Sequence, residues 1–459
     1  MTAAEWIRYT TVQELRGPLL MVSGVGEVRW DESVRIELAG GERRHGIVLD
    51  VADDVAVVEM LEGTAGMDPD RTVVEFAGAP FDIPVGDGWL GRVCNGRGVP
   101  LDEGPPVLGP RMPVSGAPLN PMRREPPADP IRTGISVIDA LTTVVRGQKL
   151  PVFSAPGLPH LRLACQIAAQ SSTGDDPFCV VVATMGLTHA DADYVRDALD
   201  ERSAAGELVL LLNLADDPVV ERLLTPRAAL TIAEHLAFGE PGGRHVLVVL
   251  ADMTNYAEAL REVSAARGEI PSRRGYPGYL YSDLASLYER CGRIRGRTGS
   301  ITVVPVLTMP GGDITHPVPD LTGYITEGQI VLSAEQQARG TYPPVDALSS
   351  LSRLMRHGTG AGRTRADHPA VAAQLLSALA RARQVRELSE LIGTGALTEI
   401  DRAHLEFADA FTTELVDQGV GECRDLDDTL DRAWQALTRL PRAALTMLPD
   451  ELLDAHEMS

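Results

Sequence analysis

Five nearly continuous apolar runs in the middle of the chain constrain its fold more than any other feature. They read KLPVFSA, FCVVVATM, ELVLLLNLA, HVLVVLAD and ITVVPVLTM, and stretches with helical spacing separate them. Strands that are covered on both faces lose the alternation of polar and apolar residues, because neither face meets water. We therefore expect an α/β domain with a parallel sheet.

Two differently patterned regions flank this α/β core. Residues 1–78 hold short alternating runs such as SVRIEL and TVVEF, which predict a small β-barrel. The stretch Pro80–Pro130 is rich in proline and glycine, and we expect an ordered connector there. After residue 360 apolar residues recur at helical spacing, and Thr398 with Asp401 can cap one of the helices. The predicted domains are a β-barrel over 1–78, an α/β domain over 79–360 and a C-terminal helical bundle over 361–459.

The composition argues against several classes of protein. The 459 residues carry a net charge of −22, which opposes non-specific binding to nucleic acid. No run of about 18 apolar residues occurs, and no basic segment precedes an apolar core at the N-terminus, so we expect neither export nor a membrane span. Five cysteines without C-x-x-C spacing predict free, packed thiols in a reducing cytosol: Cys94, Cys165, Cys179, Cys291 and Cys423.

The turn after the first apolar run occupies the place of a phosphate-binding loop. A Walker A loop reads G-x-x-x-x-G-K-S/T, because glycines let backbone N–H groups reach phosphate, lysine neutralises it and the hydroxyl holds Mg²⁺. In that frame Ser154 and Pro159 replace the glycines, while His160 and Leu161 replace the lysine and the hydroxyl residue. Gly157 and His160 remain as candidates for weak phosphate contact. Taken alone, the segment also fits an ordinary strand-to-helix turn.

Four further places carry residues that could do chemistry. Asp252 ends an apolar run, where it could be a Walker B carboxylate or the cap of the next helix. Met185 to Leu187 stand where a hydrolytic site would need a carboxylate to orient water. His316 lacks partners at metal-ligand spacing, which favours a hydrogen-bonding histidine and predicts no metal site. Arg353 follows a proline turn and fits a salt bridge, a cap or an arginine supplied to a neighbouring active site.

One segment mixes arginines with tyrosines and glycines, which is a pattern also found in proteins that bind single strands of nucleic acid. It runs from Ala266 to Arg293 and reads ARGEIPSRRGYPGYLYSDLASLYERCGR. Because the whole chain is strongly acidic, we interpret this segment as a surface that faces another protein subunit.

Taken together, these segments resemble the B (beta) subunit of the A/V-type rotary ATPases and ATP synthases. The resemblance rests on TGISVIDALTTVVRGQKLPVFSAPGLPH, LNLADDPVVERLLTPRAALTIAEHLAF, VLVVLADMTNYAEALREVSAARGEIPSRRGYPGYLYSDLASLYERCGRI, GSITVVPVLTMPGGDITHPVPDLTGYITEGQIVLS and YPPVDALSSLSRLM. These stretches cover most of the chain between Ile131 and Met355 and occur in the family's order. The resemblance implies a RecA-like, P-loop-NTPase-like central domain with a degenerate phosphate loop.

The same resemblance implies a regulatory subunit that does not hydrolyse ATP itself. Such subunits alternate with catalytic A subunits in a hexamer and contact a central and a peripheral stalk, on the cytoplasmic face of the membrane. Arg353 matches the arginine that B subunits project into the neighbouring site, and Tyr324 matches a position lining the same interface. ATP or ADP with Mg²⁺ would bind at that A/B interface, with none held tightly by this chain alone. The implied complex couples ATP synthesis or hydrolysis to transport of H⁺ or Na⁺.

The chain departs from the family at the degenerate loop, which commonly reads SASGLPHNELA and here reads SAPGLPHLRLA. Pro156, Leu161 and Arg162 change its polarity and charge, and we expect Arg162 to pair with a nearby carboxylate rather than bind an anion. One alternative is a self-sufficient hexameric NTPase or helicase, which needs an intact Walker lysine and a basic channel. Another is a stand-alone module whose pocket holds a small anion.

Overall fold

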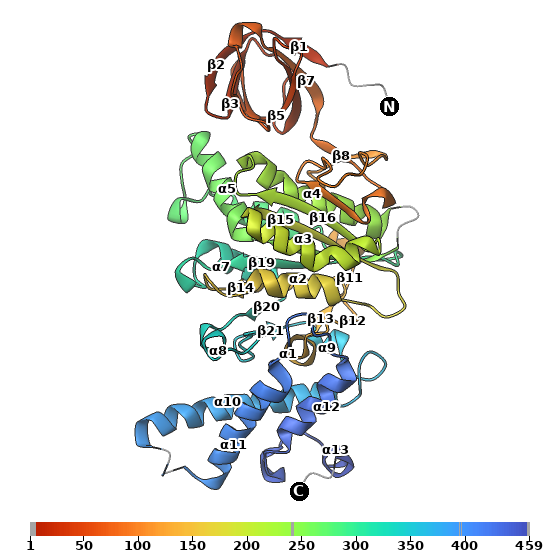
Figure 1. Ribbon diagram of the computed structural model, residues 1–459, viewed down its shortest axis with the longest axis vertical. Helices are drawn as coiled ribbons and strands as arrows, with labels where there is room; N and C mark the ends of the chain where they lie inside the picture. The colour runs from red at the N-terminus through yellow and green to blue at the C-terminus, as the bar shows by residue number, and fades with distance from the viewer. Residues whose placement is uncertain (1–5, 240–242, 394, 396, 457–459) are drawn as a thin grey trace.

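The computed structural model describes residues 6–239, 243–393, 395 and 397–456, and these form three parts stacked along one long axis (Figure 1). An antiparallel sheet forms one end, a large α/β part lies in the middle, and helices form the other end (Figure 1). None of the helices described in this structure is both long and apolar enough to cross a membrane.

The N-terminal part is a seven-stranded antiparallel sheet in the order β1-β7-β4-β5-β6-β3-β2, curled around its own core (Figure 1). The alternation in SVRIEL puts Val34 and Ile36 inside, where both are fully buried. Strands β1 and β2 are the free edges of this barrel-like sheet. Its strands are β1 (Ile7–Tyr9), β2 (Val12–Arg16), β3 (Leu19–Ser23), β4 (Glu32–Glu37), β5 (Arg43–Ala52), β6 (Val55–Met60) and β7 (Val73–Pro80).

The middle part is built on a ten-stranded sheet whose core is parallel, as the apolar runs predict. The strands follow the order β21-β20-β14-β19-β17-β15-β16-β9, and the pairs from β20 to β9 are all parallel. The strands of this sheet are β9 (Arg92–Asn95), β11 (Arg124–Glu125), β14 (Val152–Ser154), β15 (Phe178–Leu187), β16 (Leu208–Leu214), β17 (His245–Ala251), β18 (Gly292–Ile294), β19 (Ser300–Thr308), β20 (Gly328–Val331) and β21 (Leu351–Ser352).

The proline-rich connector contributes to this sheet, since its strand β9 pairs with β16 at the edge. Short antiparallel pairs complete the connector and its junctions, formed by β8 (Asp82–Pro84) with β10 (Arg111–Pro113) and by β12 (Pro130–Ile131) with β13 (Val144–Val145). The connector is therefore ordered, as its composition predicts.

Helices cover both faces of the parallel sheet, and alternate strand residues enter two different cores. Val180 and Val182 of β15 face the core that contains α2, whereas Val181 and Ala183 face the core that contains α4 and α5. The helices of this part are α1 (Ser136–Leu141), α2 (His160–Gln170), α3 (His189–Ala204), α4 (Val219–Phe238), α5 (Met253–Ala266), α6 (Leu280–Tyr288), α7 (Pro317–Ile325), α8 (Ala334–Ala338) and α9 (Met355–Gly358).

The C-terminal part consists of helices, and its local signals work as predicted. Thr398 and Asp401 form a capping box at the start of α11, and Gly393 caps the end of α10. Ile400 lies in the first turn of α11, where its side chain stays outside the core and is 51% exposed. The elements are α10 (His368–Ile392), α11 (Glu399–Ala410), a π-helical turn (Phe411–Val416), α12 (Leu426–Leu437) and α13 (Asp450–Ala455).

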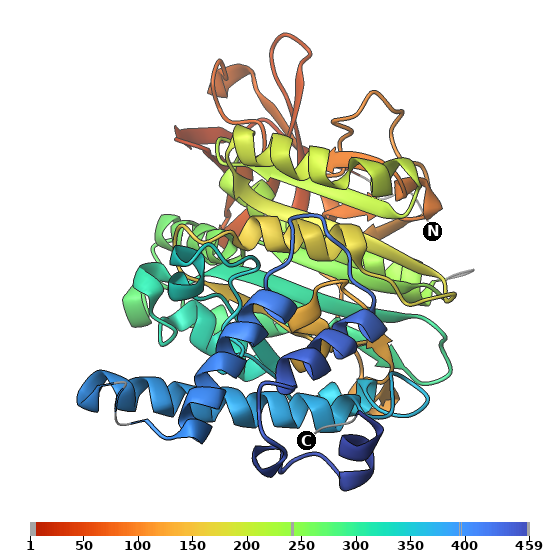
Figure 2. The same ribbon diagram turned by 60° about the horizontal axis from the view of Figure 1, so that its bottom comes forward.

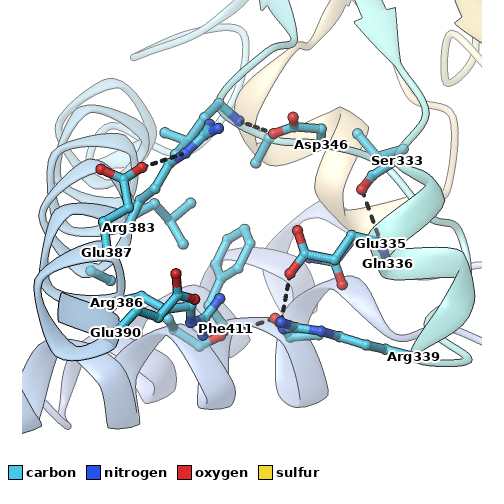
Figure 3. Close-up of a pocket in the computed structure, with 17 residues that line it drawn as sticks. Ser333, Glu335, Gln336, Arg339, Asp346, Arg383, Arg386, Glu387, Glu390 and Phe411 are labelled. Atoms are coloured by element: carbon cyan, nitrogen blue, oxygen red, sulfur yellow. Dashed lines mark hydrogen bonds and ion pairs between the residues drawn. The ribbon is translucent and has the colours of Figure 1, made fainter. Parts of the chain in front are cut away.

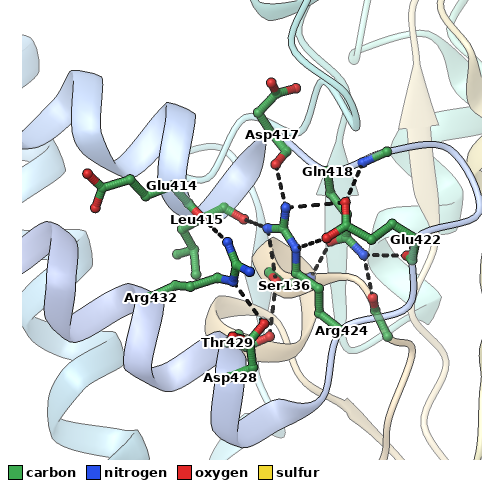
Figure 4. A network of polar contacts seen from close by, with 12 residues as sticks. Ser136, Glu414, Leu415, Asp417, Gln418, Glu422, Arg424, Asp428, Thr429 and Arg432 are labelled. Atoms are coloured by element: carbon green, nitrogen blue, oxygen red, sulfur yellow. Dashed lines mark hydrogen bonds and ion pairs between the residues drawn. The ribbon is translucent and has the colours of Figure 1, made fainter.

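One loop of the C-terminal part packs against the central domain, and we call residues 417–424 the joint loop. Its buried Arg424 donates to the carbonyl oxygens of Leu415 and Asp417 and to the Ser136 hydroxyl of α1 (Figure 4). Gln418 accepts a hydrogen bond from the Ser136 N–H and donates to the Gly134 carbonyl. The Gln166 side chain of α2 donates to the Glu422 carbonyl at 3.1 Å, and the turned view shows this loop passing in front of α2 (Figure 2). The helices and the central domain therefore share one core.

All five cysteines are free thiols, as predicted. Four of them are buried, but Cys423 in the joint loop is exposed, so its predicted packing function is wrong. Its position follows from the loop's polar contacts, which bury the neighbouring Arg424 instead.

Candidate functional site

The degenerate phosphate loop connects β14 to α2, at the carboxyl end of the parallel strands. Pro156 and Pro159 have no N–H, and the Leu158 N–H donates to the Ala155 carbonyl at 3.3 Å. The His160 N–H donates to the Leu158 carbonyl at 2.9 Å. Two of the loop's N–H groups are thus bonded within the loop. A Cβ on Gly157 would meet nothing within 4 Å, so this glycine supports the turn through its φ of +82° rather than by close packing.

A hollow of about 670 Å³ opens beside this loop. His160 reaches into it half-buried, and its Nε2 lies 3.9 Å from Oδ2 of Asp252. The hollow is lined by Leu158, Pro159, His160, Leu161, Arg162, Gly186, Leu187, Thr188, Asp191, Tyr194, Asp252, Thr254, Asn255, Thr308 and Pro310. Leucine and proline thus stand where a Mg²⁺ nucleotide would need a hydroxyl and N–H groups.

Asp252 is placed as a Walker B carboxylate would be, but both of its oxygens are already bonded. Oδ1 accepts from the Thr254 N–H at 2.7 Å, which makes Asp252 the N-cap of α5. Oδ2 accepts from the Thr308 hydroxyl at 2.5 Å. The helix-cap interpretation therefore describes this residue, and its contacts hold β17, β19 and α5 together.

No carboxylate stands where a hydrolytic site needs one to orient water. Gly186 occupies that place with φ +69°, and its N–H donates to the Asn213 side chain at 3.1 Å. Asp191 lines the same hollow, yet it accepts a hydrogen bond from Thr188 at 2.7 Å in capping α3. The hollow therefore offers neither the lysine and hydroxyl that bind phosphate and Mg²⁺ nor a free carboxylate that orients the attacking water.

Arg162 does not pair with a carboxylate, which corrects the sequence expectation. Its guanidinium carbon lies 6.0 Å from the centre of the Tyr194 ring on α3. Within the part of the chain that the structure describes, no ion pair to Arg162 is found. Arg162 thus forms a cation–π contact with Tyr194, and a separation of 32 residues in the sequence does not predict this contact.

Arg353 and Tyr324 come together at one exposed corner of the molecule. Arg353 follows β21, and its N–H donates to the Glu327 carbonyl at 2.9 Å. Its guanidinium Nη1 lies 3.4 Å from the Thr326 carbonyl, which directly follows α7. Tyr324 in the last turn of α7 is 79% exposed. Among the described residues, no carboxylate lies within ion-pair distance of Arg353.

This corner lies at the opposite end of the parallel strands from the degenerate loop. Gly328 at the start of β20 pairs with Ser352, and β20 runs parallel to β14, which ends at the loop. Arg353 therefore sits beyond the amino end of β20, whereas Gly157 and His160 sit beyond the carboxyl end of β14. The candidate residues form two separate sites rather than one.

A second hollow of about 310 Å³ lies between α8 and the C-terminal helices α10 and α11 (Figure 3). Charged side chains line it in pairs, such as Arg339 with Glu335 at 2.6 Å and Arg383 with Glu387 at 3.6 Å. Because these charges neutralise one another and no nucleophile faces the space, we assign no chemistry to it.

His316 is a hydrogen-bonding histidine, as expected. It caps α7 by accepting the Val318 N–H at 3.5 Å, and its ring meets the Tyr276 ring edge-on at 5.5 Å. Burial lowers the pKa of His316, so the ring is neutral and free to accept. No cluster of three or more His, Cys, Asp and Glu side chains that could hold a metal ion occurs in the described residues.

Comparison with known proteins shows the family of this chain. Residues 134–352 match the model of the ATP synthase alpha/beta family, nucleotide-binding domain, and residues 357–457 match the C-terminal domain of V and A type ATP synthase. The B subunit of the A-type ATP synthase of Aeropyrum pernix is 52% identical over 451 residues, which cover 98% of this chain and 97% of that protein.

The chain belongs to the family of A-type ATP synthase B subunits.

The fold supports the same assignment. The ATP synthase subunit NeqB from Nanoarcheaum equitans superposes with a TM-score of 0.74 at 36% identity, over 92% of this chain and 99% of that one. The B subunit described here is accordingly a subunit of an ATP synthase complex, with a central domain of the nucleotide-binding type.

The sequence interpretation gave no function to Lys149, although this B subunit has no other lysine in its 459 residues. Lys149 is 3% exposed and pairs with Glu327, whose carbonyl holds Arg353. A basic residue that occurs once, among 42 lysines and arginines, is a signal that composition alone could have provided.

Proposed function

We propose that this chain is the non-catalytic, regulatory B subunit of a rotary ATP synthase and lends Arg353 to the ATP site of a neighbouring catalytic A subunit. The observation that carries the proposal is the exposed Arg353 guanidinium without a carboxylate partner among the described residues. Tyr324 lines the same interface in this proposal.

The degenerate loop supports the non-catalytic half of the proposal. Its prolines lack N–H groups, the N–H groups of Leu158 and His160 are bonded within the loop, and the carboxylate of Asp252 is occupied as a helix cap. A self-sufficient NTPase would need these groups for its own nucleotide. ATP or ADP with Mg²⁺ then binds at the interface, where the catalytic subunit supplies the loop, the metal site and the base.

The physical contribution of Arg353 is charge stabilisation. Negative charge spreads over the oxygens of the transferred phosphoryl group, and a guanidinium from the next subunit offsets it in the transition state. An arginine supplied in this way is worth about 10³ to 10⁵ in rate.

The assembly that follows is an alternating hexamer of A and B subunits, which contacts a central and a peripheral stalk. In this proposal the ring lies on the cytoplasmic face of the membrane and reaches it only through other subunits. Its rotation couples ATP synthesis or hydrolysis to transport of H⁺ or Na⁺.

Substitution of Arg353 in a reconstituted ring tests the proposal. We expect rings with Arg353→Ala to assemble normally by native mass spectrometry and to hydrolyse ATP about 10³-fold more slowly or worse. Arg16→Ala is the matched control, since Arg16 is likewise an exposed arginine and lies on the N-terminal sheet. Normal ATP hydrolysis by an intact Arg353→Ala ring would refute the proposal.

A further inference from the structure

The single lysine of the chain is buried directly behind the segment that carries Arg353. Its side chain is 4% exposed, and its Nζ lies 2.6 Å from Oε1 of Glu327 and 3.5 Å from Oε1 of Glu289. Glu289 also accepts from Arg124 at 2.5 Å. Two carboxylates thus share two cations, so the ammonium group is compensated although it is removed from water.

Lys149 holds Glu327 through three contacts. Besides the ion pair, the Lys149 N–H donates to Glu327 Oε2 at 2.7 Å, and the Glu327 N–H donates to the Lys149 carbonyl at 2.9 Å. Both the backbone and the side chain of Glu327 are therefore fixed to the amino end of β14, a strand whose residues are fully buried or nearly so.

Glu327 and its neighbour in turn hold Arg353. The Arg353 N–H donates to the Glu327 carbonyl, and the guanidinium contacts the Thr326 carbonyl at 3.4 Å. The adjoining Ser352 is fixed from the same side, because its hydroxyl accepts from the Gln148 side chain at 2.9 Å. Every contact described for the backbone and side chain of Arg353 thus leads to Thr326 and Glu327, and from Glu327 to Lys149.

The type of residue at position 149 fits such a function. The other 41 lysine or arginine positions of the chain are all arginine, whose forked guanidinium suits ion pairs with two parallel hydrogen bonds. An ammonium group is a compact point charge with three donors, so it can sit between two carboxylates that converge on one place. The one lysine therefore stands where a small, centrally placed cation is required.

We propose that Lys149 is a positioning residue for Arg353, acting through its ion pair with Glu327 to hold the guanidinium in register with the neighbouring active site. This inference rests on the function proposed for Arg353. Displacement of a catalytic group by about 1 Å can cost about a hundredfold in rate, which sets the size of the expected effect.

The test uses a paired substitution that removes both charges, Lys149→Met with Glu327→Gln, because Lys149→Met alone leaves a buried carboxylate without its partner. In reconstituted rings of A and B subunits we expect kcat to fall about tenfold to a hundredfold while KM for ATP stays within about twofold. Unchanged kcat in an intact ring would overturn the inference.

A second comparison separates positioning from general stability. In an Arg353→Ala background, the paired substitution should cause no further loss of turnover, because Lys149 acts only through Arg353. The matched control is the paired substitution Arg97→Met with Glu221→Gln, since it likewise removes both charges of an ion pair with a buried carboxylate in the same domain, and it should leave kcat unchanged. An additional loss in the Arg353→Ala background, or an equal loss from the control, would show a merely structural effect and overturn the inference.

The two proposals fail in different ways. If Arg353→Ala leaves turnover intact, the proposed function of Arg353 is wrong. If Arg353→Ala lowers turnover but the paired substitution does not, only the positioning inference is wrong.

Chemical labelling adds a readout that is independent of activity. Reductive methylation with formaldehyde and a borane reductant should leave Lys149 of the native ring unmodified, because its amino group is buried and paired. Peptide mass spectrometry finds it without ambiguity, since the chain has no second lysine. Modification of Lys149 as fast as an exposed amine would contradict a rigid ion pair.

Discussion

At the scale of single residues, the chain separates groups that a self-sufficient ATPase would gather at one place. His160 and Asp252 lie beside the degenerate loop, where Asp252 is occupied in capping α5. Arg353 lies beyond the amino end of β20, where it is exposed and donates to the carbonyl oxygens of Thr326 and Glu327.

Glu59 on β6 provides a residue-scale prediction about stability. Its side chain is 4% exposed, and burial raises the pKa of Glu59 to about 7 although the charge of Arg267 opposes this shift. The folded protein therefore retains a proton on Glu59 that the unfolded chain releases near pH 4.5. The unfolding free energy should fall as the pH rises from about 4.5 to about 7, and stay lowered above that range.

Glu59→Gln should consequently raise the unfolding free energy at pH 8 by about 1 to 3 kcal/mol and have little effect at pH 4.5. Urea denaturation at the two pH values measures this difference. Glu27→Gln, at an exposed position of the same N-terminal part, should change the stability at neither pH. Equal effects of Glu59→Gln at both pH values would contradict the assignment of a protonated carboxyl.

The sequence predicts the structural function of a residue well where its contact partner is only a few positions away. The capping box of Thr398 and Asp401 spans three residues, and Asp252 caps the helix that begins beside it. The contact of Arg162 with Tyr194 could not be predicted, because two helices must first pack before the ring is available. The same applies to Lys149 and Glu327, which are distant in sequence and meet only in the folded sheet.

At the scale of elements, the joint loop 417–424 decides how the C-terminal helices are attached. Arg424 is 8% exposed and donates to two carbonyl oxygens, and its Nε also donates to Oε1 of Glu422 at 2.6 Å. The Glu422 carbonyl accepts from Gln166 of α2, the helix that begins at the degenerate loop. The C-terminal helices are thus bonded to α2 as well as to α1.

Arg424→Ala should lower the unfolding free energy by about 2 to 4 kcal/mol, because the buried carbonyl groups lose a charged donor. Hydrogen exchange followed by mass spectrometry should show faster exchange in residues 133–139 and in the joint loop, with the N-terminal sheet unaffected. The matched control Arg432→Ala removes a half-exposed arginine on the following helix and should cost less than about 1 kcal/mol. Equal destabilisation by the two substitutions would show that the buried contacts of Arg424 contribute no more to the unfolding free energy than those of an exposed arginine.

The sequence pattern predicted which segments form strands or helices, but it did not predict how these elements contact one another. The apolar runs correctly predicted a parallel sheet, since burial on both faces leaves a composition that can be read directly. The addition of β9 to that sheet was not predictable, because a four-residue strand within a proline-rich connector carries no periodic signal. Contacts of the joint loop with Gly134 and Ser136 link positions nearly 300 residues apart and leave no trace in local pattern.

At the scale of the whole molecule, three parts are stacked along one long axis (Figure 1). The N-terminal sheet has a core of its own, while the central sheet and the C-terminal helices share one. The family resemblance predicted this architecture, and the comparisons with A-type ATP synthase subunits bear it out.

The central claim is that this chain completes a neighbour's ATP site and has no competent site of its own. A structure of the reconstituted ring with ADP and aluminium fluoride, which imitates the transferred phosphoryl group, tests this claim most directly. We expect the Arg353 guanidinium to lie about 3 Å from the fluoride atoms bound at the neighbouring A subunit. An analogue site completed entirely by A-subunit residues, with Arg353 turned away into solvent, would contradict the proposed function of Arg353.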